Sequence, residues 1–209
     1  MRQILLIVFW AAFARGAEAP EAMKLARRAY EQAQAGQFGE AIAGLKEAAR
    51  LAPANPLYRS ALGGVFERQG QLGDAVAAFA EALRLDPANQ QFRGKLETIS
   101  LDHGAALARE GRNRAGLVLA KETAARFPGS ARAQLMLGLF LSRNQQNLAA
   151  VDAYRRALTL DPRSPEASVG LGIAQSGGGL AREAQATFEA GLKQFPNDAM
   201  HRRRMGCCW

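Results

Sequence analysis

The chain carries few of the side chains that catalysis or metal binding requires. Its 209 residues include two histidines, His103 and His201, and two cysteines, Cys207 and Cys208. Chemistry that needs several imidazoles or thiolates is nearly excluded by this count. Adjacent cysteines do not easily form a disulfide with each other, and at the end of the chain they are expected to lie in an exposed tail rather than to bind a soft metal. The sequence therefore predicts no metal and no cofactor.

No motif in the sequence assembles a reaction centre. A His-Glu-x-x-His pair, a phosphate-binding loop and a serine at a nucleophile elbow are all missing from the 209 residues. The glycine-rich run GLGIAQSGGG, Gly170 to Gly179, lacks the preceding strand that a phosphate site needs. His103 has no neighbouring ligands or partners in the sequence, and we expect a hydrogen-bonded core histidine rather than a ligand or base. The chain is predicted not to be an enzyme.

The net charge of +8 does not indicate a nucleic-acid partner. Of the 27 lysines and arginines, Arg2 and Arg15 lie near the N-terminus and 202–204 is an arginine triplet near the C-terminus, which leaves 22 basic against 19 acidic residues. Phosphate binding requires a dense basic patch on one face of the protein. The charge distribution therefore argues against nucleic acid.

The elements that position these side chains come from a repeat. The segment GQFGEAIAGLKEAARLAPAN, Gly36 to Asn55, returns 34 residues later as GQLGDAVAAFAEALRLDPAN, Gly70 to Asn89. Prolines mark five copies, at intervals of 34, 41, 34 and 34 residues: Pro53, Pro87, Pro128, Pro162 and Pro196. A fixed period of this size predicts stacked supersecondary units.

Each repeat is predicted to be a pair of helices. Apolar residues follow helical spacing in two runs, and Asn55-Pro56 and Ser164-Pro165 have the composition of helix starts. Glycines mark the turns within four of the repeats: Gly36, Gly70, Gly111 and Gly179.

These residues resemble the tetratricopeptide repeat, which has a small residue in its first helix and an aromatic residue in its second. The second, fourth and fifth repeats place Gly63, Gly138 and Gly172 at the small position and Phe79, Tyr154 and Phe188 at the aromatic one. In the fifth repeat Gln175 stands at the position of another aromatic residue. The resemblance implies an all-α fold, a right-handed superhelical solenoid of antiparallel helix pairs.

The third repeat departs most from the pattern, with Ala120 at the aromatic position and seven added residues, Gln90 to Leu96. Seven residues are two helical turns, so the same face stays inward. We expect one long helix from about Asn89 to Arg109, with Phe92, Leu96 and Ile99 on its buried face. A helix broken at Gly94 is the alternative. The insertion either only pads the solenoid or has a function of its own.

The two ends differ from the repeats. Residues 1–16 have the order of a cleaved secretory signal, with an apolar run from Ile4 to Ala14 that is too short for a typical membrane span. An uncleaved membrane anchor and a buried first helix are the alternatives. Residues 17–198 form the five-repeat domain, and 199–209 are an irregular or truncated tail that leaves Phe188, Leu192 and Phe195 partly covered. We expect a periplasmic or secreted protein.

The function expected from the resemblance is that of an interaction scaffold. Relatives bind peptides or helices on a concave wall made by the first helices of the pairs, and here that wall would include these residues: Tyr30, Leu57, Ser60, Leu101, Ala105, Leu135, Leu139, Val169 and Ile173. The residues of a carboxylate clamp for chaperone tails are replaced by Ala26, Tyr30, Ala61 and Gly64. The alternative is a module that self-associates through its C-terminal face, or a fragment of a larger protein.

Three arginines share one position at the end of the first helices: Arg68, Arg109 and Arg143. They either complement the helix C-terminal dipole in solvent or form a row that holds an acidic, amphipathic segment. Partner identity cannot be predicted from these residues.

Overall fold

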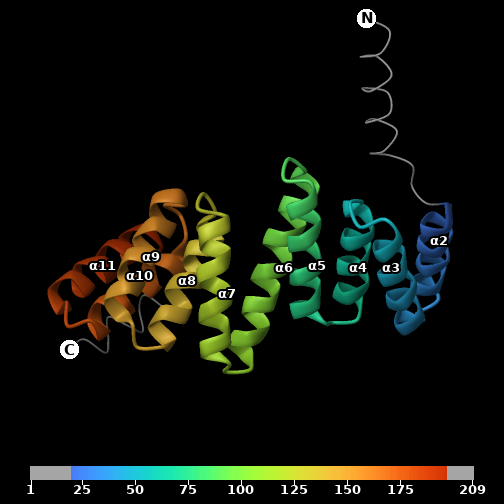
Figure 1. The fold of residues 1–209 in the computed structure, drawn as a ribbon. Coiled ribbons are helices and arrows are strands. Elements are labelled where there is room, and N and C mark those ends of the chain that lie inside the picture. Colours follow the sequence, from blue (N-terminus) through green and yellow to red (C-terminus); the bar gives the residue numbers. More distant parts are fainter. Residues whose placement is uncertain (1–19, 197–209) are drawn as a thin grey trace, which may run out of the picture. The chain divides into compact units, whose positions relative to one another are not determined.

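The computed structural model describes residues 20–196, and all of its regular structure in this range is α-helical (Figure 1). The helices are α2 (Pro20–Gln34), α3 (Phe38–Leu51), α4 (Pro56–Arg68), α5 (Leu72–Leu85), α6 (Gln90–Arg109), α7 (Asn113–Arg126), α8 (Ala131–Arg143), α9 (Asn147–Leu160), α10 (Pro165–Gly177) and α11 (Ala181–Gln194). Taken in order they form five antiparallel pairs, one for each repeat. The predicted all-α repeat fold is confirmed.

A left-handed residue closes the turn inside every pair. Gly36, Gly70, Gly111 and Gly179 have φ between +71° and +82°, and the equivalent residue of the fourth repeat, Gln145, has φ +62°. The following amide then donates to a carbonyl five residues back, as from Gln146 to Leu141 over 2.9 Å. This is the hydrogen bond of a Schellman motif, which usually requires glycine at the left-handed position. The fourth repeat forms the same turn without glycine.

Polar side chains cap the first helices, as the sequence predicts. Asn55 Oδ1 accepts a hydrogen bond from the Leu57 amide over 2.9 Å, and Ser164 Oγ accepts one from Ala167 over 3.2 Å. Asn89 and Ser130 cap α6 and α8 in the same way. Each cap satisfies a backbone donor that the helix itself leaves free.

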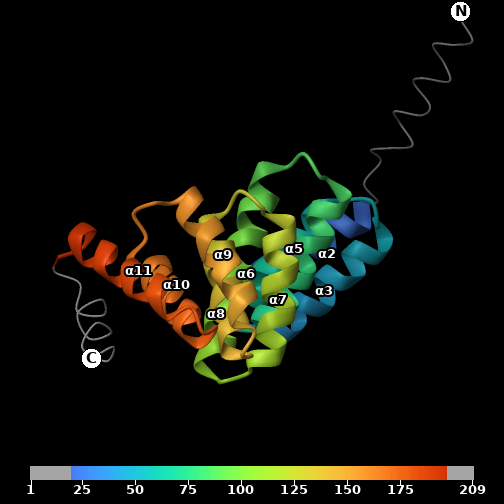
Figure 2. The same ribbon diagram turned by 90° about the vertical axis from the view of Figure 1, so that its left-hand side faces the viewer.

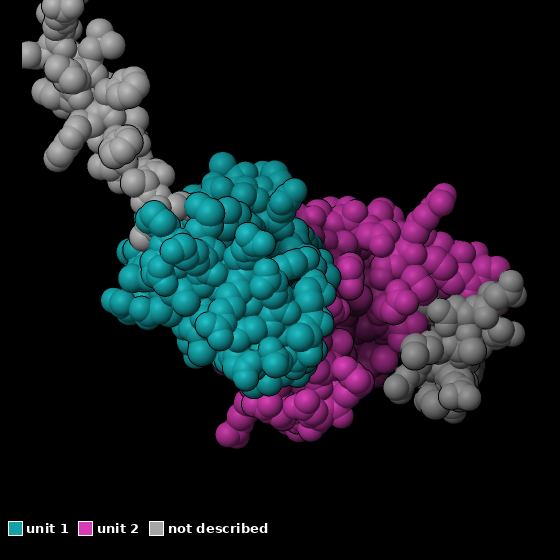
Figure 3. All heavy atoms as spheres, turned by 90° about the vertical axis from the view of Figure 1, so that its right-hand side faces the viewer, with its two compact units in different colours: residues 1–99 teal, residues 100–209 magenta. Residues whose placement is uncertain are grey.

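The chain divides into two compact units, which Figure 3 colours separately. Unit 1 ends at Ile99 and unit 2 begins at Ser100, so the division falls within α6. The core of unit 1 includes Ala29, Ala33, Ala41, Leu45, Leu62 and Val65. The core of unit 2 includes Leu141, Ala150, Val151, Ala153, Tyr154, Leu171 and Ala174. Each unit therefore buries apolar residues of its own.

Glycines in the first helices allow large rings of the second helices to pack closely. A Cβ atom at Gly63 would lie 2.8 Å from the Phe79 ring, and one at Gly138 would lie 2.8 Å from the Tyr154 ring. At Gly172 it would lie 2.5 Å from Phe188, which is 2% exposed. Such distances are too short for carbon atoms, so these positions require glycine. The predicted pairing of small and aromatic residues is confirmed in all three repeats.

The third repeat reaches a dense core by another arrangement within unit 2. Where Ala120 replaces the ring, side chains of α8 occupy the space: Met136 lies against Gly104, and Phe140 against Gly116. A Cβ atom at either glycine would collide with them, and Phe140 is fully buried. Figure 2 shows α6, α7 and α8 near one another. The small residues of this repeat are thus matched by large residues of the next.

The added residues lengthen α6 rather than break it. The helix runs without interruption from Gln90 to Arg109, and Gly94 lies inside it. Phe92, Leu96 and Ile99 are 5%, 2% and 2% exposed, respectively. The predicted long helix and its buried face are confirmed, and the alternative of a break at Gly94 is wrong.

Candidate protein-binding surface

In unit 1 the first helices of the first two repeats, α2 and α4, border an apolar hollow of about 480 Å³. We call it the α2/α4 hollow. Tyr30 and Leu57 stand at its edge and are 65% and 59% exposed, and the small side chains of Ala26 and Ala61 line it. Three residues predicted for the binding surface, Tyr30, Leu57 and Arg68, thus line one hollow. Exposed side chains beside an apolar hollow can contact a ligand without rearranging the core.

Arg68 also lines the α2/α4 hollow, and its guanidinium contacts the ring of Phe38 in α3. The guanidinium carbon lies 5.3 Å from the centre of the Phe38 ring, a distance suited to a cation–π interaction. Within residues 20–196 no carboxylate forms an ion pair with Arg68. The hollow therefore presents an exposed and positioned positive charge.

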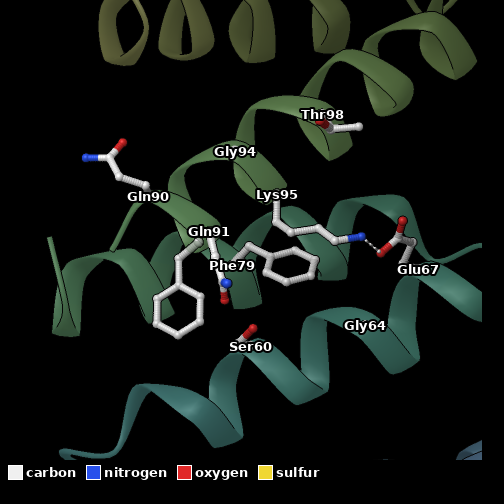
Figure 4. Close-up of a pocket in the computed structure, with 10 residues that line it drawn as sticks. Ser60, Gly64, Glu67, Phe79, Gln90, Gln91, Gly94, Lys95 and Thr98 are labelled. Atoms are coloured by element: carbon white, nitrogen blue, oxygen red, sulfur yellow. Dashed lines mark ion pairs between the residues drawn. The ribbon is translucent and has the colours of Figure 1, made fainter. Parts of the chain in front are cut away.

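Unit 1 has a second hollow, of about 700 Å³, between α4 and the N-terminal half of α6 (Figure 4). We call it the α4/α6 hollow. Phe79 and Phe92 are among its lining residues. Figure 4 shows Lys95 reaching from α6 toward Glu67 on α4. The Nζ and Oε2 atoms of this ion pair are 3.5 Å apart. Most of the α6 residues that line this hollow belong to the seven-residue insertion.

Unit 2 has a smaller hollow of about 200 Å³ between α6 and α8. The predicted surface residues Leu101, Leu135 and Leu139 all line it. Leu101 is only 8% exposed, however, and Leu135 and Leu139 are half-buried. These side chains take part in packing, so the surface they offer a ligand is small.

On α10 of unit 2, the residues predicted to line the binding surface are largely buried. Val169 is 5% exposed, which corrects the expectation that it belongs to an open wall, and Ile173 is half-buried. In the same helix Gly170 packs against the Tyr154 ring, and a Cβ atom there would lie 2.5 Å from it. Helix α10 therefore packs closely on α9 at this point.

Arg109 and Arg143 are exposed, but both donate hydrogen bonds to carbonyl groups near the end of α6. Arg109 Nε donates to Ala105 over 3.4 Å, and Arg143 Nη1 reaches from α8 to Ala108. Within unit 2 these two arginines are therefore neighbours that satisfy helix C-terminal carbonyls. Arg68 lies in the other unit. The proposed row of three arginines remains a prediction.

His103 is half-buried in α6, and its Nδ1 has no hydrogen-bond partner among the described residues. The expectation of a hydrogen-bonded core histidine is therefore wrong for this atom. Burial lowers the pKa of His103 below its ordinary value, and the positive charge of Arg112 adds to this effect while Glu110 opposes it. The imidazole is thus held in its neutral form near pH 7.

Other sequence features have structural roles within residues 20–196. The glycine-rich run begins inside α10, where Gly170 and Gly172 accept the rings of Tyr154 and Phe188. Gln175, at the position of an aromatic residue, is buried and accepts a hydrogen bond from Thr187 over 2.7 Å. No group of three potential metal ligands occurs in this part of the chain, and none of its helices has the length and apolar content to cross a membrane.

The C-terminal face is more covered than the sequence suggests. Phe188 is buried against Gly172, which corrects the expectation of partial exposure, whereas Leu192 and Phe195 are half-buried. The predicted signal, residues 1–16, and the predicted tail, residues 199–209, lie outside the described residues.

The α4/α6 hollow was not predicted from the sequence, although the seven-residue insertion that lines it is visible there.

Family models identify the repeat directly. A tetratricopeptide repeat model matches residues 26–90 and 101–165, and a second tetratricopeptide repeat model matches residues 141–203. Residues 91–100, which hold most of the insertion, fall outside these matches. No curated protein matches the chain.

Solved structures show the same fold. YrrB, described as a TPR protein with an unusual peptide-binding site, has a TM-score of 0.59 at 16% identity and covers 94% of this chain and 96% of its own. For MamA 41-end from Desulfovibrio magneticus RS-1 the TM-score is 0.55 at 23% identity, covering 88% of this chain and 99% of its own. A tetratricopeptide repeat protein from Parabacteroides merdae ATCC 43184 has a TM-score of 0.56 at 22% identity, covering 91% of this chain and 73% of its own. The shared architecture is that of the helical solenoids.

Proposed function

We propose that this chain, which belongs to the tetratricopeptide repeat family, is a protein-interaction scaffold that binds a peptide or helical segment of a partner on its first helices. The observation that carries the proposal is the α2/α4 hollow, an apolar surface that is lined by exposed Tyr30 and Leu57 and by Arg68. Covering apolar surface contributes roughly 25 cal/mol per Å², and the arginine can hold a carboxylate or carbonyl of the ligand. We propose no catalytic role.

The family and one structural relative support this proposal. Proteins with tetratricopeptide repeats bind proteins or peptides in general, and YrrB is described by its peptide-binding site. At 16% identity that likeness concerns the fold, so the ligand of YrrB is not transferred to this chain. Support for binding at a particular place comes from the hollows of unit 1.

An affinity-capture experiment with matched surface variants tests the proposal. The whole chain serves as bait for the proteins of its source cells, and Tyr30→Ser/Leu57→Ser is compared with Val118→Ser/Leu148→Ser. Val118 and Leu148 are 60% and 62% exposed but lie on second helices, so both variants remove similar exposed apolar area. We expect capture to be lost only with the first variant. Equal capture by all three proteins would refute binding on the first helices.

We further propose that the scaffold acts in the cell envelope or outside the cell, because residues 1–16 have the composition of a cleaved signal. The mature chain should then begin at or near Ala17. Intact-mass measurement of the protein from the envelope and secreted fractions tests this. An intact chain that begins at Met1 and sediments with membranes would support the uncleaved anchor instead.

A further inference from the structure

Three glycines inside helices of unit 1, Gly39, Gly64 and Gly94, are not explained by the packing of the protein itself, and two of them, Gly64 and Gly94, line a hollow. Gly64 lies inside α4 and Gly94 inside α6, and a Cβ atom at either position would meet nothing within 4 Å. They differ from Gly63, where a ring occupies the space. A glycine within a helix costs about 0.5–1 kcal/mol of stability relative to alanine. At Gly64 and Gly94 this loss of stability is not accompanied by a closer contact within unit 1.

Gly64 lines both hollows of unit 1. The α2/α4 hollow lies on one side of it and the α4/α6 hollow on the other. At the same position, the other repeats carry a side chain: Tyr30, Ala105, Leu139 and Ile173. Because Gly64 has none, no side chain separates the two hollows at this point of α4. A bound chain can therefore cross α4 with its backbone close to Gly64.

The insertion supplies the far wall of the α4/α6 hollow. Gln90, Gln91, Phe92, Gly94 and Lys95 all line it, and all belong to the two added turns of α6. In Figure 4 Gly94 lies on α6 across the opening from Ser60 and Gly64 on α4. The added turns thus do more than lengthen the helix, because they form a space that a repeat of ordinary length would lack.

We infer that unit 1 binds an extended, acidic segment of a partner protein that crosses α4 over Gly64 and places one apolar side chain in each hollow. The inference rests on the proposed scaffold function and specifies its site. The charge of the ligand follows from the lining residues: Glu67 and Lys95 neutralise each other, whereas Arg68 has no carboxylate partner among the described residues. An acidic residue of the ligand provides that partner.

The sizes of the hollows suit such a ligand. An apolar cavity of roughly 150 Å³ holds a benzene molecule, so hollows of about 480 and 700 Å³ each accept an aromatic side chain. Neighbouring packed helices lie about 8–10 Å apart, and an extended chain advances about 3.3 Å per residue. The two apolar side chains are therefore expected roughly two to four residues apart in the ligand.

Fluorescence anisotropy with defined peptides tests this site. The probes are fluorescein-labelled peptides of serine and aspartate with two phenylalanines two, three or four residues apart, and a matched set in which lysine replaces aspartate. We expect the whole chain to bind at least one acidic probe and to bind the lysine probes at least about tenfold more weakly. No measurable binding of any acidic probe, or equal binding of both sets, overturns the inference.

Substitutions then locate the ligand. Gly64→Leu should weaken binding of the acidic probe at least about tenfold, since its side chain projects where the hollows meet. Gly39→Leu is the matched control, because Gly39 lies in α3 outside both hollows and a Cβ atom there also meets nothing within 4 Å. Its affinity should equal that of the unmodified chain. Circular dichroism should show all variants folded.

One further variant separates this inference from the proposed function. Ala105→Leu changes the equivalent position of unit 2 and should leave probe binding unchanged. If Ala105→Leu removes binding while Gly64→Leu does not, the site on unit 1 is wrong and the scaffold function stands. If the cellular partner is still captured by Tyr30→Ser/Leu57→Ser, the first-helix scaffold fails as well.

Discussion

The two units are built from the same repeat, but their exposed large apolar side chains lie on different helices of the pair. In unit 1 the exposed large apolar side chains lie on first helices, at Met23, Tyr30 and Leu57. In unit 2 they lie on second helices, at Val118, Leu148 and Leu160. The equivalent first-helix positions of unit 2 carry polar residues (Arg132 and Glu166), half-buried ones (Leu139 and Ile173) or a small one (Ala105). A ligand that binds first helices therefore finds more apolar surface on unit 1.

The two units also differ in the polar contacts that join consecutive repeats. In unit 2, side chains bind backbone carbonyls of the neighbouring repeat, as from Asn147 Nδ2 to Gly177 over 2.9 Å and from Gln194 Nε2 to Pro162 over 2.9 Å. Arg143 and Asn144 make similar bonds to the repeat before them. In unit 1, Arg68 instead lies at the edge of a hollow. Unit 1 also has a polar contact between repeats, the ion pair of Lys95 with Glu67, but its Arg68 forms no ion pair among the described residues.

The largest effect is expected in the core of unit 2. Phe140→Ala removes a fully buried ring that fills the space beside Gly116, and it should lower the free energy of unfolding by about 3–5 kcal/mol. Val65→Ala removes a smaller side chain from the same repeat position in unit 1 and should cost less. Urea unfolding followed by circular dichroism measures both. Equal losses of unfolding free energy for the two variants would contradict the larger contribution of Phe140 to its core.

Leucine at two glycines of the first helices should have opposite effects in the two units. Gly138→Leu forces a side chain into the Tyr154 ring and should destabilise the protein by about 1–3 kcal/mol. Gly64→Leu meets empty space and should stabilise the fold by about 0.5–1 kcal/mol, because leucine favours helix. Thermal unfolding distinguishes them. A midpoint unchanged by Gly138→Leu would contradict the close packing of α8 on α9.

Charge reversal should have different effects at Arg143, which donates a hydrogen bond within unit 2, and at Arg68, which we propose contacts the ligand. Arg143→Glu breaks the bond to Ala108 and should cost about 0.5–1.5 kcal/mol of stability. Arg68→Glu should leave the thermal midpoint nearly unchanged and remove capture of an acidic partner. Changing all three arginines should remove both capture and its salt dependence. Capture with unaltered salt dependence would mean that these cations lie outside the binding surface.

The left-handed turn of the fourth repeat offers a smaller gain in unit 2. Gln145 has φ +62°, where a side chain costs about 1–2 kcal/mol and the other repeats use glycine. Gln145→Gly should therefore raise the free energy of unfolding by about 1 kcal/mol, since glycine removes the strain but is more flexible when unfolded. Gln146→Gly, next to it, is the control and should give no gain. A loss of stability in Gln145→Gly would show that the turn is not strained.

The pH dependence of stability provides the smallest effect. The pKa of His103 is lowered in the folded state, mainly by burial, so the unfolded chain binds a proton more readily. Stability should therefore be complete above the ordinary pKa of about 6.5 and fall as the pH decreases below it. His103→Gln should flatten this part of the curve. If urea midpoints between pH 7.5 and 5 show the same slope in both proteins, His103 does not contribute.

The sequence predicted the helix pairs because their signals are local. The caps Asn55 and Ser164 and the packing of Gly138 against Tyr154 each depend on one repeat alone, and the 34-residue period shows which residues of the repeats are equivalent. The packing of the third repeat could not be predicted in this way, since Phe140 fills its core from the next repeat. The contact of Gly170 with Tyr154 likewise joins residues of two repeats. The α4/α6 hollow is lined by the insertion in α6 and by Gly64 in α4. Neither feature by itself predicts a hollow.

Mapping the ligand by nuclear magnetic resonance tests the central claim, that unit 1 is the binding unit, most directly. The isotope-labelled chain is titrated with the acidic, two-phenylalanine peptide of highest affinity, and backbone amide shifts are followed for α2 to α11. We predict that the large shifts fall on α2, α4 and the first two turns of α6, with Gly64 among the most affected. Large shifts confined to α8 and α10, with α4 unaffected, would contradict the account.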